Sequence, residues 1–265
     1  MTAIQEMLNQ IREKAKLPNT ERRSDTSANA EQWRCEQLNR IAEKMPEISG
    51  FSCTACGDIG GKYEIINGGY ISWTPCPHCA NIRKGFYLLK KSGLADKTFD
   101  SFKTAAEWQK GLLGKVSAYT SSEDSWLYMG GQSGCGKTHL CTAAVRELIL
   151  SKNVSARLFK WVEDARLLKA LANDSSYISE IDRFRTATIL YIDDLFKGGV
   201  TAADLKLAYD ILDYRYRHNL RTIISSEMFL DEIIGKDEAL GGRIKEMSED
   251  FSLNITRDKG KNYRL

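Results

Sequence analysis

Several features that mark whole classes of protein are missing from this 265-residue chain. No apolar run reaches the roughly 18 residues that a membrane-spanning helix needs. The first residues, Met1-Thr-Ala-Ile-Gln-Glu-Met, are amphipathic and lack the charged and then apolar stretches of a signal peptide. We therefore expect a soluble, cytoplasmic protein without a membrane partner, whose thiols stay reduced and form no disulfide framework.

The chain also lacks a strong excess of charge of either sign. Its 38 Lys and Arg residues nearly balance its 35 Asp and Glu residues, which leaves a net charge of +3. No field over the whole surface then attracts nucleic acid, so such a contact has to come from local patches. Hydrophobic residues make up 42% of the chain, enough for a real core. The length suits one large domain, or an ATPase core with small additions.

Residues 131–138, Gly-Gln-Ser-Gly-Cys-Gly-Lys-Thr, fit the phosphate-loop pattern G-x-x-x-x-G-K-[ST] at every fixed position. The glycines let the backbone N–H groups point at phosphate oxygens, the lysine reaches the β- and γ-phosphates, and the threonine hydroxyl holds Mg²⁺. An apolar strand over 125–130 enters the loop, and a helix over 139–150 leaves it with its N-terminus facing the anion. This context disfavours a chance match in a glycine-rich turn. The predicted nucleotide-binding residues are Gly131, Gly134, Cys135, Gly136, Lys137, Thr138 and His139.

A second motif follows about 55 residues downstream. Residues 188–195, Thr-Ile-Leu-Tyr-Ile-Asp-Asp-Leu, form an apolar run closed by two carboxylates, which is typical of a buried parallel strand with ligands at its C-terminal end. We expect Asp193 to hold Mg²⁺ and Asp194 to orient or deprotonate the attacking water. An ordinary turn is the alternative, and the upstream phosphate loop disfavours it.

Strands and helices alternate through the second half, which predicts an α/β fold with a parallel sheet between helices. The predicted strands are 156–161, 188–195, 221–226 and 251–256, and the predicted helices are 162–172 and 202–219. On the helix over 162–172 we expect Val162, Ala165, Leu168 and Ala172 to share one apolar face.

The first third contains two cysteine pairs, Cys53-Thr-Ala-Cys56 and Cys76-Pro-His-Cys79. This is the C-x₂-C, spacer, C-x₂-C arrangement of a tetrahedral zinc site, and four thiolates would make Zn²⁺ structural. Between the pairs, 62–66 and 70–73 flank Asn-Gly-Gly and predict a β-hairpin, so the module reads as a zinc ribbon. A redox dithiol, unconnected cysteines, and His78 in place of one thiolate are the alternatives.

The N-terminal 50 residues are predicted to form a helical arm. Apolar residues recur at helical spacing in two segments, separated by a polar linker over 18–28. The first stripe is Ile4, Met7, Leu8, Ile11 and Ala15, and the second is Trp33, Leu38, Ile41 and Met45. The arm either docks on a partner or packs on its own chain. The resulting division is 1–50 for the arm, 51–93 for the zinc module and 94–265 for the ATPase domain.

Together with the phosphate loop and Ile-Asp-Asp, three further segments resemble a known family: 94–102, Thr-Ile-Ile-Ser-Ser-Glu at 222–227, and Gly-Gly-Arg-Ile-Lys-Glu-Met at 241–247. Residues 94–265 are similar to AAA+ ATPases of the DnaC/DnaI type, the bacterial and phage loaders of the replicative helicase. The transposition helper IstB is a close relative. The resemblance implies a slow ATPase that switches between ATP and ADP, in a bacterial or phage-infected cell.

The resemblance also implies roles for particular residues. The family places a polar γ-phosphate sensor after strand 221–226, where this chain has Ser226 and then Glu227. Arg243 matches the arginine finger that reaches a neighbouring subunit, so self-association is expected. Arg215 is a second candidate for a phosphate or interface contact, with a solvated helix face as the alternative. About 20 residues follow Arg243, too few for a helical lid, so closure of the site would depend on a partner subunit.

In these loaders single-stranded DNA runs along a helix-bearing insertion after the second core strand, which maps to 159–169 here. Basic side chains there would meet phosphates, and Phe159 or Trp161 would stack on a base, unless both rings belong to the core. The basic residues are Lys160, Arg166 and Lys169.

The favoured function is therefore delivery of a hexameric DnaB-type helicase onto single-stranded DNA at replication initiation. One alternative is an IstB-like helper that grips duplex DNA, which the zinc module disfavours. The other is a small-molecule P-loop kinase, which paired carboxylates and a trans arginine disfavour.

Overall fold

The computed structural model describes residues 27–66, 69–123 and 126–263, in two compact units. The smaller unit contains 27–44 and 61–75, and the larger contains 45–60 and 76–263. The predicted three-part division grouped these segments differently, with the hairpin and the cysteines in one module. The predicted helix with the stripe from Ile4 to Ala15 lies outside the described residues.

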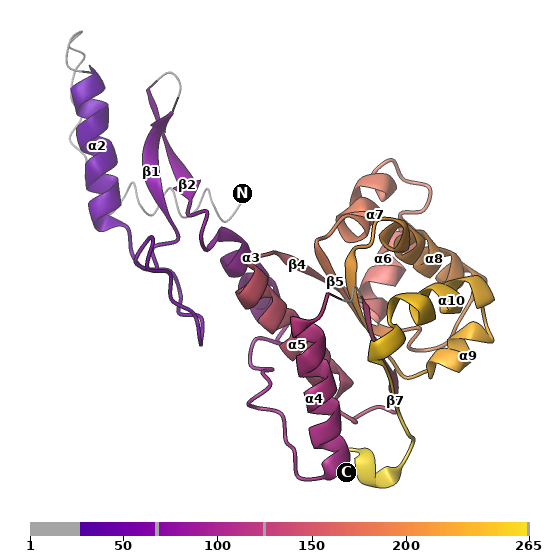
Figure 1. The fold of residues 1–265 in the computed structure, drawn as a ribbon. Coiled ribbons are helices and arrows are strands. Elements are labelled where there is room, and N and C mark those ends of the chain that lie inside the picture. The colour runs from indigo at the N-terminus through magenta and orange to yellow at the C-terminus, as the bar shows by residue number, and fades with distance from the viewer. Residues whose placement is uncertain (1–26, 67–68, 124–125, 264–265) are drawn as a thin grey trace. The chain divides into compact units, whose positions relative to one another are not determined.

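The smaller unit is a helix beside a β-hairpin (Figure 1). Helix α2 (Ser27–Ile41) precedes strands β1 (Gly61–Ile66) and β2 (Tyr70–Pro75), which pair antiparallel from Gly61↔Pro75 to Ile66↔Tyr70. The predicted hairpin is thus confirmed. The Asn39 amide of α2 donates to the Tyr63 carbonyl at 2.9 Å and accepts from the Tyr63 N–H at 2.7 Å. Helix α2 therefore binds β1 of the hairpin through polar groups. In the predicted apolar stripe, Trp33 and Ile41 are 54% and 56% exposed.

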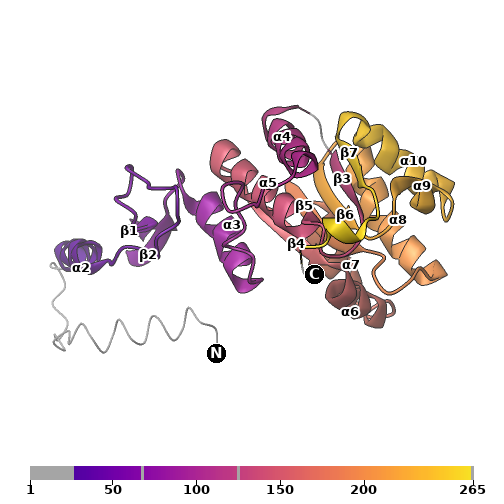
Figure 2. The same ribbon diagram turned by 90° about the horizontal axis from the view of Figure 1, so that it is seen from below.

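The larger unit is built on a five-stranded sheet in the order β4-β5-β6-β3-β7, in which every pairing is parallel (Figure 2). This confirms the predicted α/β class. The strands are β3 (Trp126–Gly131), β4 (Ala156–Lys160), β5 (Ile189–Leu195), β6 (Arg221–Ser226) and β7 (Ser252–Ile255). Strand β3, which lies between β6 and β7, is buried over its whole length because helices cover both faces of the sheet.

The two faces have separate cores, since side chains alternate along each strand. Leu127 and Met129 of β3 pack with the first helices of the unit, and Trp126 and Tyr128 pack with the later ones. The first face is covered by α3 (Ala80–Lys91), α4 (Glu107–Ser121) and α5 (Lys137–Lys152). The second face is covered by η1 (Trp161–Ala165), α6 (Arg166–Ala170), α7 (Tyr177–Arg185), α8 (Ala202–Arg217), α9 (Leu230–Ile234) and α10 (Glu238–Met247).

The predicted regular helix over 162–172 is wrong in detail. The chain forms a π-turn over η1 and then the short helix α6, and Val162 of the predicted apolar face is 57% exposed. The cause is local: the Asp164 carboxylate accepts a hydrogen bond of 2.7 Å from the Lys160 N–H, which shapes the exit from β4. After α10, the described chain contains two single 3₁₀ turns, η2 (Glu249–Phe251) and η3 (Lys259–Lys261), and β7. In the part of the chain that the structure describes, no helix is both long and apolar enough to cross a membrane.

Candidate functional site

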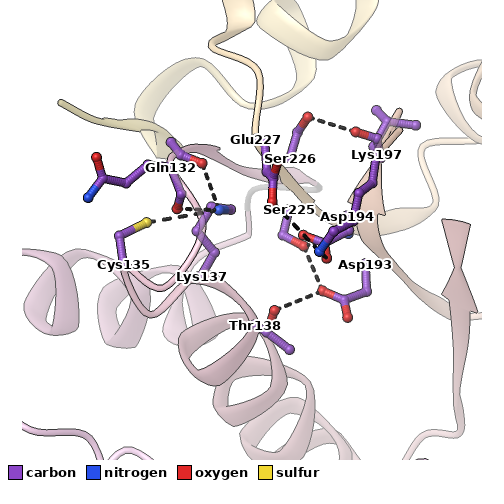
Figure 3. Close-up of polar contacts among 12 residues, drawn as sticks. Gln132, Cys135, Lys137, Thr138, Asp193, Asp194, Lys197, Ser225, Ser226 and Glu227 are labelled. Carbon is purple, nitrogen blue, oxygen red and sulfur yellow. Dashed lines mark hydrogen bonds and ion pairs between the residues drawn. The ribbon is translucent and has the colours of Figure 1, made fainter. Parts of the chain in front are cut away.

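The phosphate loop connects β3 to α5 at the C-terminal edge of the sheet. Gly134 and Gly136 have φ of +79° and +95°, a left-handed conformation that glycine adopts without strain. Lys137 is buried, and its Nζ donates to the carbonyls of Gly131 and Gln132 at 2.7 and 2.8 Å. The loop is therefore closed around its own lysine, which lies beside the buried Cys135 (Figure 3).

The loop threonine and the first strand carboxylate lie together, as the sequence predicts for two magnesium ligands. Thr138 Oγ1 donates to Asp193 Oδ1 at 3.1 Å (Figure 3). Two further hydroxyls donate to the same oxygen, from Tyr191 at 2.6 Å and from Ser225 at 2.8 Å. Burial raises the pKa of Tyr191 well above its usual range, so its phenol stays neutral and keeps donating. Oxygen donors of this kind suit Mg²⁺.

Sequence reasoning missed Tyr191 and Ser225. Tyr191 could have been found from strand alternation, because residues two apart point to the same face as Asp193. Ser225 sits on the neighbouring strand β6, and its Oγ also accepts the Asp194 N–H at 2.9 Å. It thus ties both acidic residues of β5 to β6.

Ser226 is one of the two residues predicted as the γ-phosphate sensor. Its hydroxyl is fully buried, donates to the Leu195 carbonyl at 2.8 Å and accepts from the Met228 N–H at 3.1 Å, so it holds β6 to backbone. Glu227 lies at the edge of the site, with a carboxylate oxygen 3.6 Å from Lys197 Nζ. The serine of β6 that faces Asp193 is Ser225.

Asp194 has a left-handed backbone with φ of +57°, and its carboxylate pairs with Lys197 Nζ at 2.5 Å. The water-orienting role predicted for Asp194 therefore requires its release from Lys197. Lys197 lies at a cleft of about 450 Å³ that Gln132 and Ser133 of the phosphate loop also line. This cleft therefore lies beside the phosphate loop.

Two segments pack on the phosphate loop, one around Thr98 and one near the C-terminal end of the described chain. His139 Nε2 lies 2.8 Å from the Thr98 carbonyl oxygen, and the His139 ring meets the Phe102 ring edge-on. From the C-terminal side, the Tyr263 N–H donates to the Gly134 carbonyl at 2.9 Å. Asp258 N–H donates to the Gln132 side chain at 2.8 Å. No pattern in the sequence predicts this tail contact.

Arg243 on α10 contacts α8 of its own chain. Its guanidinium lies 3.0 Å from Asp213 Oδ1, donates to the Tyr209 hydroxyl at 2.9 Å and stacks over the Tyr209 and Tyr216 rings. Its side chain remains 22% exposed. A role in a neighbouring subunit's site would exchange these contacts for new ones.

Both interpretations of Arg215 are wrong, since its side chain is fully buried. It reaches neither phosphate nor solvent because its guanidinium donates to four backbone carbonyls and one hydroxyl. The acceptors are Phe184, Arg185, Ala187, Arg221 and Thr222, at 2.6 to 3.0 Å. Burial lowers the pKa of Arg215 to about 9, which still leaves it cationic at neutral pH.

The segment predicted to meet DNA is only partly available. Phe159 and Trp161 are 0% and 3% exposed, so the stacking role is not supported and both rings belong to the core. The basic residues are at the surface: Lys160 Nζ lies 3.7 Å from Glu163, and Lys169 pairs with Asp204 at 2.7 Å. Arg166 and Lys169 line a second cleft of about 450 Å³.

The four cysteines of the first third converge. Their Sγ atoms lie within 4.8 Å of one another, with Cys53–Cys76 at 3.9 Å and Cys56–Cys79 at 3.7 Å. Tetrahedral zinc with Zn–S bonds of about 2.3 Å would place its sulfurs about 3.8 Å apart, so the cluster fits this ion. Burial raises the pKa of the Cys79 thiol to about 12, and a bound cation would offset that cost. His78 is not part of the cluster.

Comparison with known proteins places this site in context. Residues 92–242 match the model of a family described as IstB-like ATP binding protein. The XkdC protein of the phage-like element PBSX from Bacillus subtilis (strain 168) is 34% identical over 246 residues, which span 85% of this chain and 90% of that protein.

Two solved structures share the fold. The DnaC helicase loader superposes with a TM-score of 0.51 at 20% identity, over 61% of this chain and 97% of that chain. The DnaI structure superposes with a TM-score of 0.50 at 21% identity, over 61% of this chain and 88% of that chain. At these identities the likeness establishes the architecture of the ATPase core.

Proposed function

Because the chain belongs to the family of IstB-like ATP binding proteins, we propose that it is an ATP-hydrolysing helicase loader. The resemblance to the DnaC/DnaI and IstB type, predicted from the sequence, is confirmed for family and fold. In the proposed role the protein binds a hexameric DnaB-type helicase and delivers it onto single-stranded DNA. Similarity to a protein of a phage-like element supports a phage-encoded loader.

The observation that carries the ATPase proposal is the convergence of three hydroxyls on Asp193 Oδ1 beside the phosphate loop. In this proposal Thr138 and Asp193 hold Mg²⁺, which would neutralise charge on the β- and γ-phosphates. Lys137 moves from the loop carbonyls to the phosphates, and the loop N–H groups bind their oxygens. Asp194 orients the attacking water, and Arg243 is supplied to a neighbouring copy's site.

The cysteine cluster is proposed to hold structural zinc. Four thiolates would fill the tetrahedral shell and leave no open position for chemistry. The cluster also receives support from the protein around it, since the Gly60 N–H donates to Cys56 Sγ at 3.3 Å. Asp58, which pairs with Arg83 at 3.1 Å, accepts from the Cys53 N–H at 2.8 Å.

The smaller unit is proposed to bind the helicase. Its described residues expose five large hydrophobic side chains, of which Tyr70 is 73% exposed, and the others are Trp33, Ile41, Ile65 and Ile66. Aromatic anchors of this kind dominate protein interfaces. DNA is proposed to contact Lys160, Arg166 and Lys169 of the larger unit through phosphates, without the stacking on Phe159 or Trp161.

Native mass spectrometry with a DnaB-type hexamer, ATP and Mg²⁺ tests this function. A stoichiometric complex that is weakened by Trp33→Ala and Ile41→Ala, but not by Val162→Ala in the larger unit, is expected. The family name favours a second candidate, a transposition helper that grips duplex DNA. ATP-dependent binding to duplex DNA, with no helicase complex under any nucleotide condition, would shift the assignment to that helper.

A further inference from the structure

The two clefts of the larger unit share one wall. Residues 197–200, which follow β5, line the cleft beside the phosphate loop and also the cleft that contains Arg166 and Lys169. A change in the position of this short segment therefore alters both clefts at once. Nothing in the established family assignment requires such a link.

The shared wall is held at its two ends and open in the middle. On one side Phe196 is 4% exposed and its ring meets Trp161 edge-on, with ring centroids 5.0 Å apart. On the other side Thr201 caps α8, accepting from the Asp204 N–H at 3.2 Å. Between them, a Cβ added at Gly198 or Gly199 would meet nothing within 4 Å. The segment thus has room to shift between fixed ends.

The backbone of this segment also stores strain. Asp194 and Phe196 are non-glycine residues with φ of +57° and +64°, and Gly198 and Gly199 have φ of +91° and +119°. Non-glycine residues in this region cost free energy that surrounding contacts must offset, and such residues concentrate at switch segments. A loss of the contacts that hold these residues would therefore favour another backbone conformation of the shared wall.

Lys197 is the charged residue of the shared wall, and it lines both clefts. Its Nζ lies 2.5 Å from an Asp194 carboxylate oxygen and 3.6 Å from one of Glu227, and its side chain is 41% exposed. The hydrogen bond to Asp194 raises the pKa of Lys197, so the group stays cationic. Arg257, the other cation lining this cleft, is already bound by Glu232 at 2.7 Å.

We propose that Lys197 senses the terminal phosphate of ATP and transmits its presence to the second cleft. Resting on the proposed ATP binding, this inference holds that Lys197 leaves Asp194 and Glu227 to bind the γ-phosphate. The shared wall moves with it and reshapes the cleft of Arg166 and Lys169. The same exchange frees the Asp194 carboxylate for its water. Because ADP has no γ-phosphate, it leaves Lys197 on its two carboxylates.

The first readout is the ratio of ADP to ATPγS dissociation constants, measured with Mg²⁺ by calorimetry. Lys197→Ala removes the phosphate contact and leaves two unpaired carboxylates, so this ratio should fall about tenfold, or about 1.4 kcal/mol. ADP affinity stays unchanged and reports that the variant is folded. Lys197→Arg should keep most of the preference, and Glu227→Ala should raise ATPγS affinity by removing a competitor. Lys206→Ala, an exposed lysine of α8 outside both clefts, is the matched control.

The second readout is the ¹⁹F resonance of 5-fluorotryptophan at Trp161, which lines the second cleft and is identified by its loss in Trp161→Phe. ATPγS should shift this resonance and ADP should not, and Lys197→Ala should abolish the difference. If wild type binds neither nucleotide, the proposed function and this inference both fail. If Lys197→Ala keeps both the preference for ATPγS and the Trp161 shift, the inference alone is overturned.

Discussion

Ser225 offers the sharpest test of the candidate site, because a nearly identical control lies next to it. Ser225 Oγ donates to Asp193 and accepts from the Asp194 N–H, whereas Ser226 Oγ donates to the Leu195 carbonyl and accepts from the Met228 N–H. Both hydroxyls are fully buried, donate one bond and accept one, and Ser225 Oγ also lies 3.4 Å from the Tyr191 hydroxyl. Replacing each by alanine removes the same atoms from the same strand.

The expected magnitudes follow from the partners. Either substitution leaves a buried N–H without its acceptor, which should lower the free energy of unfolding by about 1–2 kcal/mol. Only Ser225→Ala also removes a donor from an ionised carboxylate, a bond worth about 2 kcal/mol. If that bond orients Asp193 in the transition state, its loss reduces kcat/KM for ATP about thirtyfold.

The assay is steady-state phosphate release with ATP and Mg²⁺, measured with single-stranded DNA and the helicase present, alongside thermal unfolding. Ser225→Ala should lose turnover about thirtyfold, and Ser226→Ala should stay within about twofold of wild type. Both should lower the unfolding midpoint, and Ser225→Ala should lower it further because it also loses the bond to the Asp193 carboxylate. Equal turnover in the two variants would refute the role assigned to Ser225, and a larger loss in Ser226→Ala would restore the original sensor prediction.

Three further predictions concern stability and the metal. Arg215→Met leaves five acceptors without their donor and should lower the free energy of unfolding by about 4 kcal/mol, or the thermal midpoint by roughly 10 °C. Arg217→Met loses only the pair between an exposed arginine and Asp213 and should cost under about 1 kcal/mol. Similar midpoints in the two variants would contradict the structural role of Arg215. Purified protein should contain stoichiometric zinc by elemental analysis, and Cys79→Ser should remove it; a zinc-free wild type that keeps its thermal midpoint would exclude the metal. Tyr263→Ala removes the hydroxyl that donates to the Lys103 carbonyl at 2.8 Å. It should weaken nucleotide binding a few-fold, about 0.5–1 kcal/mol, as measured by calorimetry. An unchanged affinity would show that this contact does not support the phosphate loop.

Local patterns explain what could be predicted from the sequence. The phosphate loop, its flanking strand and helix, and the Asp193 strand are each encoded by neighbouring residues, so the pattern and the structure agree. The hairpin follows from Asn-Gly-Gly between two β-prone runs, and the cysteine cluster from C-x₂-C spacing. In each case the physical requirement lies within a few consecutive residues.

The misses arise where two distant strands meet. Which of two consecutive serines faces Asp193 depends on the register of β6 against β5, and that register shifts between Ile192 and Leu195. No pattern within 221–227 records this irregularity. Sequence spacing alone therefore could not tell that Ser225 is the serine that contacts Asp193.

Arg215 shows the same limitation in a different form. Its five acceptors come from the end of α7, the turn before β5 and the start of β6. Carbonyls at a helix end have no partner within the helix, and a cation there is favourable. The carbonyls that Arg215 binds belong to three separate segments, whereas the residues around it in the sequence predict a solvated helix.

The position of β3 in the sheet has a consequence for biosynthesis. Its neighbours are β6 and β7, which are made long after the phosphate loop that β3 supports. As the chain leaves the ribosome, β3 emerges well before the two strands with which it pairs. Such non-local pairing slows folding. The nucleotide site can thus be completed only after β7 has been made, and a chain cut short before β7 would leave an apolar strand edge open to aggregation.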